Sequence, residues 1–154
     1  MNNISSYSLI LGGAKALDKI SQTPRLDSEL LLAKILKIGR DQFYCKDIFP
    51  ERKQIQAYDA LLKKRIQGTP VAYLTGWKEV WSLPLKVNQD TLIPRPETEH
   101  LVQQSLVRLD NLEKNYQVLE LGTGCGAVAI ALAKERPKAS IFATDVSPKA
   151  LKIG

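Results

Sequence analysis

The sequence has few of the residues that build metal centres, disulfide frameworks or membrane spans. Its 154 residues include two cysteines and one histidine, and Cys45 and Cys125 lie too far apart in sequence for a disulfide framework or a zinc cage. No apolar run approaches the roughly 20 residues that span a bilayer. The short apolar stretch at residues 9–11 has no basic residue before it, so a signal peptide is not expected. We therefore expect no metal, no membrane association and, from the sparse cysteines, a cytoplasmic protein.

The overall composition is that of an ordinary globular protein with a small basic excess. Hydrophobic residues make up 44% of the chain and charged residues 25%, and the net charge is +6. Residues 1–70 contain 12 Lys and Arg against 7 Asp and Glu, so most of the excess lies there. A basic surface can attract RNA or an acidic protein. Without dense clusters, however, a solvated helical surface accounts for an excess of this size.

The first 70 residues have the apolar spacing and the end signals of short helices. One helix is expected over residues 5–20. A second follows Pro24 and ends before Gly39, and a third follows Pro50 and ends at Gly68. Because the connections between them are short, residues 1–70 are predicted to form a small helical bundle.

The pattern changes after Pro70, where aromatic and β-branched residues are interrupted by glycine and proline. Residues 71–93 are therefore predicted to form a β-hairpin linker. Residues 94–154 form the third predicted segment, which opens with a helix that has Pro96 at its first position. Val102, Leu106 and Leu109 give that helix one apolar stripe.

Residues 117–145 have the order of a strand, a glycine loop, a helix and a second strand. The strands are expected at residues 117–121 and 140–144, and the alanine-rich helix at 127–134. This order opens a doubly wound parallel sheet. The glycines of the loop let the chain turn sharply and let a ligand approach the main chain. Asp145, after the second strand, can accept hydrogen bonds from both ribose hydroxyls of an adenosine cofactor.

The spacing of the loop and its charge favour one adenosine cofactor over another. The third glycine comes one residue too early for the dinucleotide fingerprint. Glu120 would repel a pyrophosphate but attract the ammonium group of S-adenosylmethionine. A methyltransferase is therefore favoured, and a dehydrogenase is the least expected alternative. The predicted cofactor-binding residues are Glu120, Gly122, Thr123, Gly124, Cys125, Gly126 and Asp145. Cys125 is expected to be structural rather than nucleophilic, and His100 to be an exposed surface residue.

Four stretches resemble the HemK family, methyltransferases that modify the glutamine side-chain nitrogen of peptide chain release factors. They lie at residues 25–33, 68–76, 93–99 and 120–126. The most specific is Ile-Pro-Arg-Pro-Glu-Thr-Glu at 93–99, whereas the glycine loop is common to many methyltransferases. The resemblance implies a Rossmann-like class I methyltransferase domain that follows a helical substrate-recognition domain.

The resemblance also implies a substrate and a division of roles. The substrate would be the Gly-Gly-Gln tip of a release factor, so the enzyme would act in translation termination without direct contact with nucleic acid. The family binds S-adenosylmethionine on the loop from Gly122 to Gly126 and on Asp145, with Glu120 facing the methionine end. The Asn-Pro-Pro-Tyr motif that holds the glutamine amide in the family does not occur in this sequence. No catalytic residue is therefore assigned, and the chain is expected to be a truncated family member, inactive alone.

Two further functions remain open at this point. The chain could be a binding module for release factors without catalysis. It could instead belong to an adenine methyltransferase that acts on nucleic acid, which would suit the basic first half. The signature at 93–99 and the linker favour the protein substrate.

Overall fold

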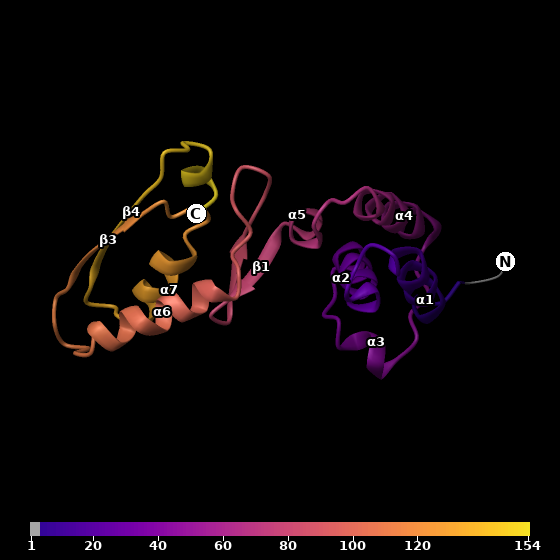
Figure 1. Cartoon of the computed structure of the whole chain (residues 1–154). Coiled ribbons are helices and arrows are strands. Elements are labelled where there is room, and N and C mark those ends of the chain that lie inside the picture. Colours follow the sequence, from indigo (N-terminus) through magenta and orange to yellow (C-terminus); the bar gives the residue numbers. More distant parts are fainter. Residues whose placement is uncertain (1–3) are drawn as a thin grey trace. The chain divides into compact units, whose positions relative to one another are not determined.

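The computed structural model describes residues 4–154, which divide into two compact units (Figure 1). The first unit ends at Thr75 and the second begins at Gly76. No helix in the described part of the chain has the length and apolar character needed to cross a membrane.

Within residues 4–75, the first unit contains five helices that pack around an apolar core. The helices are α1 (Ser6–Leu17), α2 (Pro24–Leu36), α3 (Gln42–Cys45), α4 (Arg52–Ile66) and α5 (Val71–Thr75). The core is formed by side chains from four of these helices, namely Ile10, Leu31, Leu32, Tyr58 and Leu74. Burial of these side chains is the main stabilising contribution to the unit.

Local chemistry explains where these helices begin and end. At the start of α4, Glu51 and Gln54 form a capping box, in which the Glu51 amide donates to Gln54 Oε1 at 2.8 Å. The end of α2 differs from the sequence prediction, because Lys37 rather than Gly39 adopts the left-handed conformation that stops the helix (φ 55°). The single turn of α3 was not predicted.

The close packing of α1 depends on a glycine. A Cβ atom at Gly13 would lie 1.9 Å from Tyr58 Oη and 2.6 Å from Ser28 Oγ. These two hydroxyls lie 2.7 Å apart, and Ser28 Oγ also donates to the Ile10 carbonyl at 3.0 Å. Only hydrogen at position 13 leaves room for this buried hydrogen-bonded pair.

The second unit is an α/β structure. It contains β1 (Trp77–Val80), β2 (Leu83–Lys86), α6 (Glu97–Arg108), β3 (Gln117–Leu121), α7 (Ala127–Glu135), β4 (Ser140–Thr144) and the 3-10 turn Ala150–Lys152. The strands β1 and β2 pair antiparallel, and β3 and β4 pair parallel. The predicted fold class, a helical part followed by a hairpin and the opening of a Rossmann-like sheet, is confirmed.

The hairpin is shorter than the segment for which the sequence predicts it. Residues 71–75 form α5 instead of a strand, because the Tyr73 and Leu74 amides donate to the Pro70 carbonyl and Leu74 packs in the helical core. Strand pairing is confined to residues 77–86. The prediction for Pro96 was also wrong by one position, since α6 begins at Glu97 and Pro96 is its N-cap.

The hairpin turns at two non-glycine residues, Trp81 (φ 54°) and Ser82 (φ 56°). Positive φ at both turn residues suits the twist of a hairpin but costs free energy for residues with a side chain. Contacts with two helices hold Trp81 there: its amide donates to Glu99 Oε1 and its indole N–H to Glu135 Oε1, each at 2.8 Å. Trp81 thereby attaches the hairpin to α6 and α7.

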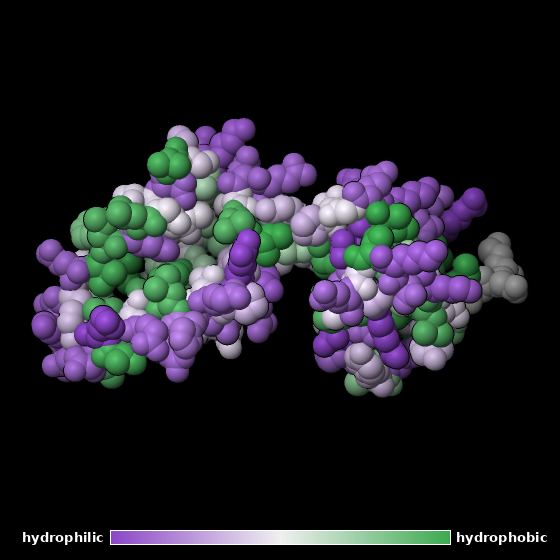
Figure 2. All heavy atoms as spheres, viewed as in Figure 1, coloured by the Kyte–Doolittle hydropathy of each residue, from purple (hydrophilic) through white to green (hydrophobic). Residues whose placement is uncertain are grey.

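The parallel strands have one covered face and one bare face. Val118 and Ile141, a register pair, pack on the core that α6 and α7 form around Val102, Val128, Ala131 and Leu132. The opposite face carries Leu119, Leu121 and Phe142, which are 62%, 76% and 60% exposed. Figure 2 shows apolar side chains gathered over this part of the second unit.

Candidate functional site

The site is built on the loop that connects β3 to α7. The three glycines of this loop, Gly122, Gly124 and Gly126, all have positive φ angles of 75°, 59° and 79°. Residues with a Cβ rarely adopt such angles, which explains why glycine occupies these positions. The Gly122 and Thr123 amides both donate to the Thr144 carbonyl, at 2.8 and 2.9 Å, so the loop is held against the end of β4.

Glu120, the next-to-last residue of β3, stabilises the loop through hydrogen bonds. Its Oε2 accepts hydrogen bonds from Thr123 Oγ1 at 2.8 Å and from the Ala129 amide in α7 at 3.0 Å. Its other oxygen, Oε1, has no hydrogen-bond partner within residues 4–154. Glu120 therefore has a structural role and still has one oxygen that a cationic ligand group could contact.

Asp145 follows β4 and contacts the same loop. Its Oδ2 accepts from the Gly124 amide and its Oδ1 from the Ser147 amide, both at 2.8 Å. These backbone donors, Ser147 first and then Gly124, lower the pKa of the Asp145 carboxyl below its ordinary value. Each carboxylate oxygen has a second lone pair, so Asp145 can accept further hydrogen bonds from a ligand.

A cleft of about 250 Å³ opens above the loop. Five of the seven residues predicted to bind the cofactor line it: Glu120, Gly122, Thr123, Gly124 and Cys125. Gly126 and Asp145 do not line the cleft; Gly126 begins the turn into α7, and Asp145 contacts the loop through Gly124. A Cβ added at Gly122 or Gly124 would meet no atom within 4 Å, so the loop leaves open space at both positions.

The opposite wall of the cleft comes from residues that the sequence analysis did not assign to the site. They lie in and before α6, and they are Leu92, Pro94, Thr98 and Leu101. The stretch at 93–99 was noted only as a family signature. Its proline-rich, helix-starting pattern carried no signal for a ligand, so only the structure brings it to the loop.

The two side chains considered as a possible nucleophile or base, Cys125 and His100, differ in their exposure. Cys125 is 3% exposed, and burial raises the pKa of its thiol, which disfavours the reactive thiolate. His100 is exposed on α6. Within the described residues, no group of three or more His, Cys, Asp and Glu side chains is placed to hold a metal ion.

Comparison with known proteins finds a family model that matches each unit. Residues 8–76 match the family model of the PrmC N-terminal domain, and residues 97–153 match that of lysine methyltransferases. Proteins called release factor glutamine methyltransferase are similar over most of the chain. The one from Coxiella burnetii is 50% identical over 141 residues, which are 91% of this chain and 50% of that protein.

Two further proteins with the same name are similar over a comparable part of the chain. The Escherichia coli protein is 47% identical over 137 residues, 86% of this chain and 48% of its own length. The Rhodopirellula baltica protein is 41% identical over 139 residues, 88% of this chain and 47% of its own length. The chain thus spans about half the length of the curated relatives it matches.

The strand, the glycine loop with its carboxylates and the helix after it define the opening of a Rossmann-like methyltransferase unit. The helical unit before it matches the PrmC N-terminal domain, which restricts the class to methyltransferases that carry this domain. The chain belongs to the HemK family.

Proposed function

We propose that this chain belongs to an enzyme that transfers a methyl group from S-adenosylmethionine to the glutamine side chain in the Gly-Gly-Gln motif of peptide chain release factors. The observation that supports a donor site is the cleft lined by the positive-φ glycines Gly122 and Gly124, with Glu120 at its wall and Asp145 fixed to its loop. The names of the relatives support the substrate.

The residues of the cleft fit the chemical groups of the donor. Glu120 Oε1, which lacks a protein partner among the described residues, would accept a hydrogen bond from the donor's ammonium group. The open space at Gly122 and Gly124 would let the donor approach the main chain. The remaining lone pairs of Asp145 would accept the ribose hydroxyls. When bound, S-adenosylmethionine supplies a methyl group on a positively charged sulfur that a nucleophile can attack.

The glutamine amide needs further residues, because its nitrogen lone pair is delocalised and weakly nucleophilic. Aligning such a nitrogen with the methyl group can contribute roughly 7–11 kcal/mol of the barrier. The family uses an Asn-Pro-Pro-Tyr motif for this, and the 154 residues do not contain it. We therefore propose that residues 1–154 supply the donor half of the site and the helical substrate-recognition domain, but transfer no methyl group alone.

Radiolabelled methyl transfer tests this function. A chain extended through an Asn-Pro-Pro-Tyr motif should label a purified release factor, and residues 1–154 should not. A release factor with its Gly-Gly-Gln glutamine changed to alanine should remain unlabelled, which separates glutamine transfer from the lysine transfer suggested by the second family model. Labelling of DNA or RNA in place of the release factor would contradict the proposal.

A further inference from the structure

The family signature at residues 25–33 contains charged residues that the donor site does not use. Asp27, Ser28 and Glu29 are consecutive on α2 and only 7%, 0% and 2% exposed. Asp27 and Ser28 serve the packing of the helices: Asp27 pairs with Arg65 of α4 at 2.9 Å, and Ser28 bonds to Tyr58. Glu29 belongs to a different group of side chains, which opens to the surface.

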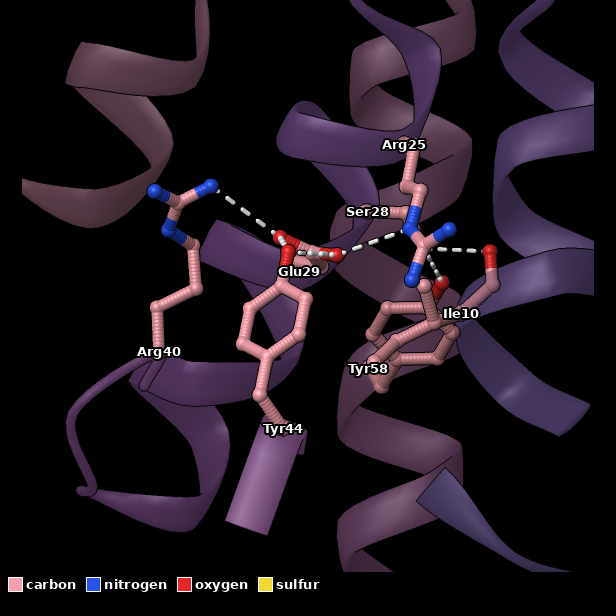
Figure 3. A network of polar contacts seen from close by, with 7 residues as sticks. All are labelled: Ile10, Arg25, Ser28, Glu29, Arg40, Tyr44 and Tyr58. Atoms are coloured by element: carbon pink, nitrogen blue, oxygen red, sulfur yellow. Dashed lines mark hydrogen bonds and ion pairs between the residues drawn. The ribbon is translucent and has the colours of Figure 1, made fainter. Parts of the chain in front are cut away.

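Three donors converge on the Glu29 carboxylate (Figure 3). Arg25 Nε donates to Oε1 at 3.0 Å, Arg40 Nη1 donates to Oε2 at 3.1 Å, and Tyr44 Oη lies 2.8 Å from Oε1. The three donors come from the first turn of α2, from the loop after it and from α3. Because both oxygens accept hydrogen bonds from cations, the buried charge of Glu29 is compensated.

The two guanidinium groups are only partly used by this contact. Arg25 bonds through Nε alone and Arg40 through Nη1 alone, and their side chains are 56% and 45% exposed. Their remaining N–H groups have no acceptor within residues 4–154. Two positive charges around one negative charge leave the group with a net positive charge.

These side chains surround a hollow of about 290 Å³. Arg25, Glu29, Arg40 and Tyr44 line it together with Thr23, Pro24 and Leu26. The Tyr44 ring lies 6.0 Å from the Arg25 guanidinium carbon, which further restrains that side chain. A pair of guanidiniums held in place by a buried carboxylate is pre-organised to bind an anion, since little side-chain entropy remains to be lost.

We propose that this hollow binds a carboxylate side chain from an acidic segment of a protein partner. The proposal rests on the proposed function, in which the partner is a release factor. Arginine N–H groups match a carboxylate in geometry as well as charge. A nucleic acid is the less suitable occupant, because its affinity comes from many cations placed along the phosphate backbone, and the hollow presents two.

The test is calorimetry of the full chain with a purified release factor, at two salt concentrations. Arg40→Ala should weaken binding about tenfold, which corresponds to one lost charge-assisted contact. The matched control is Arg52→Ala, which removes the same charge from an exposed position at the start of α4 and should change affinity less than twofold. Arg40→Lys keeps the positive charge beside Glu29 but loses the planar donor pair, so it should bind more weakly than wild type.

Equal weakening by Arg40→Ala and Arg52→Ala would show only diffuse electrostatic attraction and would overturn the proposal. Wild-type affinity in both Arg40→Lys and Arg25→Lys would do the same, because it would show that the planar donors contribute nothing. Transfer RNA that binds more tightly than the release factor, with selective loss in Arg40→Ala, would reassign the hollow to nucleic acid. Methyl labelling of the release factor by the chain extended through an Asn-Pro-Pro-Tyr motif, with unchanged binding in Arg40→Ala, would reject the hollow alone. Absence of both binding and labelling by that extended chain would reject the proposed function too.

Discussion

The Asp145 carboxylate accepts a hydrogen bond from the Gly124 amide at 2.8 Å, although 21 residues separate the two in sequence. The other Asp145 oxygen accepts from the Ser147 amide at 2.8 Å. Asp145 therefore fixes the conformation of the glycine loop before any ligand arrives. If the same carboxylate holds the donor ribose, loop order and donor affinity depend on one side chain.

Replacing Asp145 by alanine should weaken the binding of S-adenosylmethionine on the order of ten- to a hundredfold, because ligand contacts and loop restraint are lost together. Calorimetry of the full-length protein measures this. Asp59→Ala, an exposed change on α4, removes the same charge and should leave the affinity unchanged. Unchanged affinity in Asp145→Ala would remove Asp145 from the site.

The pH dependence of the loop follows from the lowered pKa of Asp145. A group whose pKa is lowered in the folded state stabilises that state above its unfolded pKa of about 3.9, and this contribution is lost as the pH falls through the folded pKa. The Gly124 amide resonance should therefore stay constant from neutral pH to about pH 4 and shift only below it. An NMR titration with a midpoint above the unfolded value would contradict the hydrogen bonds described.

Gly124→Val should reduce donor affinity at least as much as Asp145→Ala does. Position 124 has φ 59° and its Cβ would project into open space, so the change both strains the loop and fills the cleft. Gly68→Val is the control, because Gly68 also has a positive φ (96°) with open space at Cβ but lies outside the cleft. Both variants should lose roughly 1–3 kcal/mol of stability, and only Gly124→Val should lose donor affinity.

Alanine substitutions at the two adjacent glycines of α1 should change the stability of the helical unit in opposite directions. Gly12→Ala meets no atom within 4 Å and should stabilise the helix by roughly 0.5–1 kcal/mol. Gly13→Ala would collide with Tyr58 Oη and should destabilise the helical unit by roughly 1–3 kcal/mol. Urea unfolding followed by circular dichroism measures both values, and the same sign for both would show that α1 packs differently.

Losing the indole N–H of Trp81 should loosen the hairpin. Trp81→Phe leaves Glu135 without its donor and should cost roughly 1.5–3 kcal/mol, the range for hydrogen bonds to charged groups. Glu135→Gln keeps an acceptor and should cost less. Thermal unfolding measures both losses, and equal losses in the two variants would argue against the contact.

The parts of the fold that depend on short-range pattern could be predicted from the sequence. The strands β3 and β4 have the predicted residues, since each is a short apolar run bounded by turn signals. Residues 71–75 could not be read in this way, because their β-branched and aromatic composition favours a strand while Pro70 and the helical core impose a turn of helix. The positive φ of Trp81 could not be predicted either, because Glu99 and Glu135, which stabilise it, lie on helices that are distant in sequence.

Part of the candidate site could likewise be predicted from the sequence, and part could not. The loop between β3 and α7 was predicted from its glycines, and five of the assigned residues line one cleft. The wall opposite was not predicted, because Leu92 and Thr98 precede the loop by more than 20 residues and reach it only through the packing of α6 on α7. The roles of the site residues in donor binding remain predictions that the variants above test.

The bare face of β3 and β4 has a practical consequence for work on this chain. Leu119, Leu121 and Phe142 form a contiguous water-exposed surface that does not repel a second copy, because it carries no charge. Sulfate and phosphate salts strengthen apolar association, so crystallisation or salting-out conditions would drive molecules together through this face. Ligand binding at the cleft and at the arginine hollow should therefore be measured with dilute protein in low-salt buffer, where association through this face is weakest.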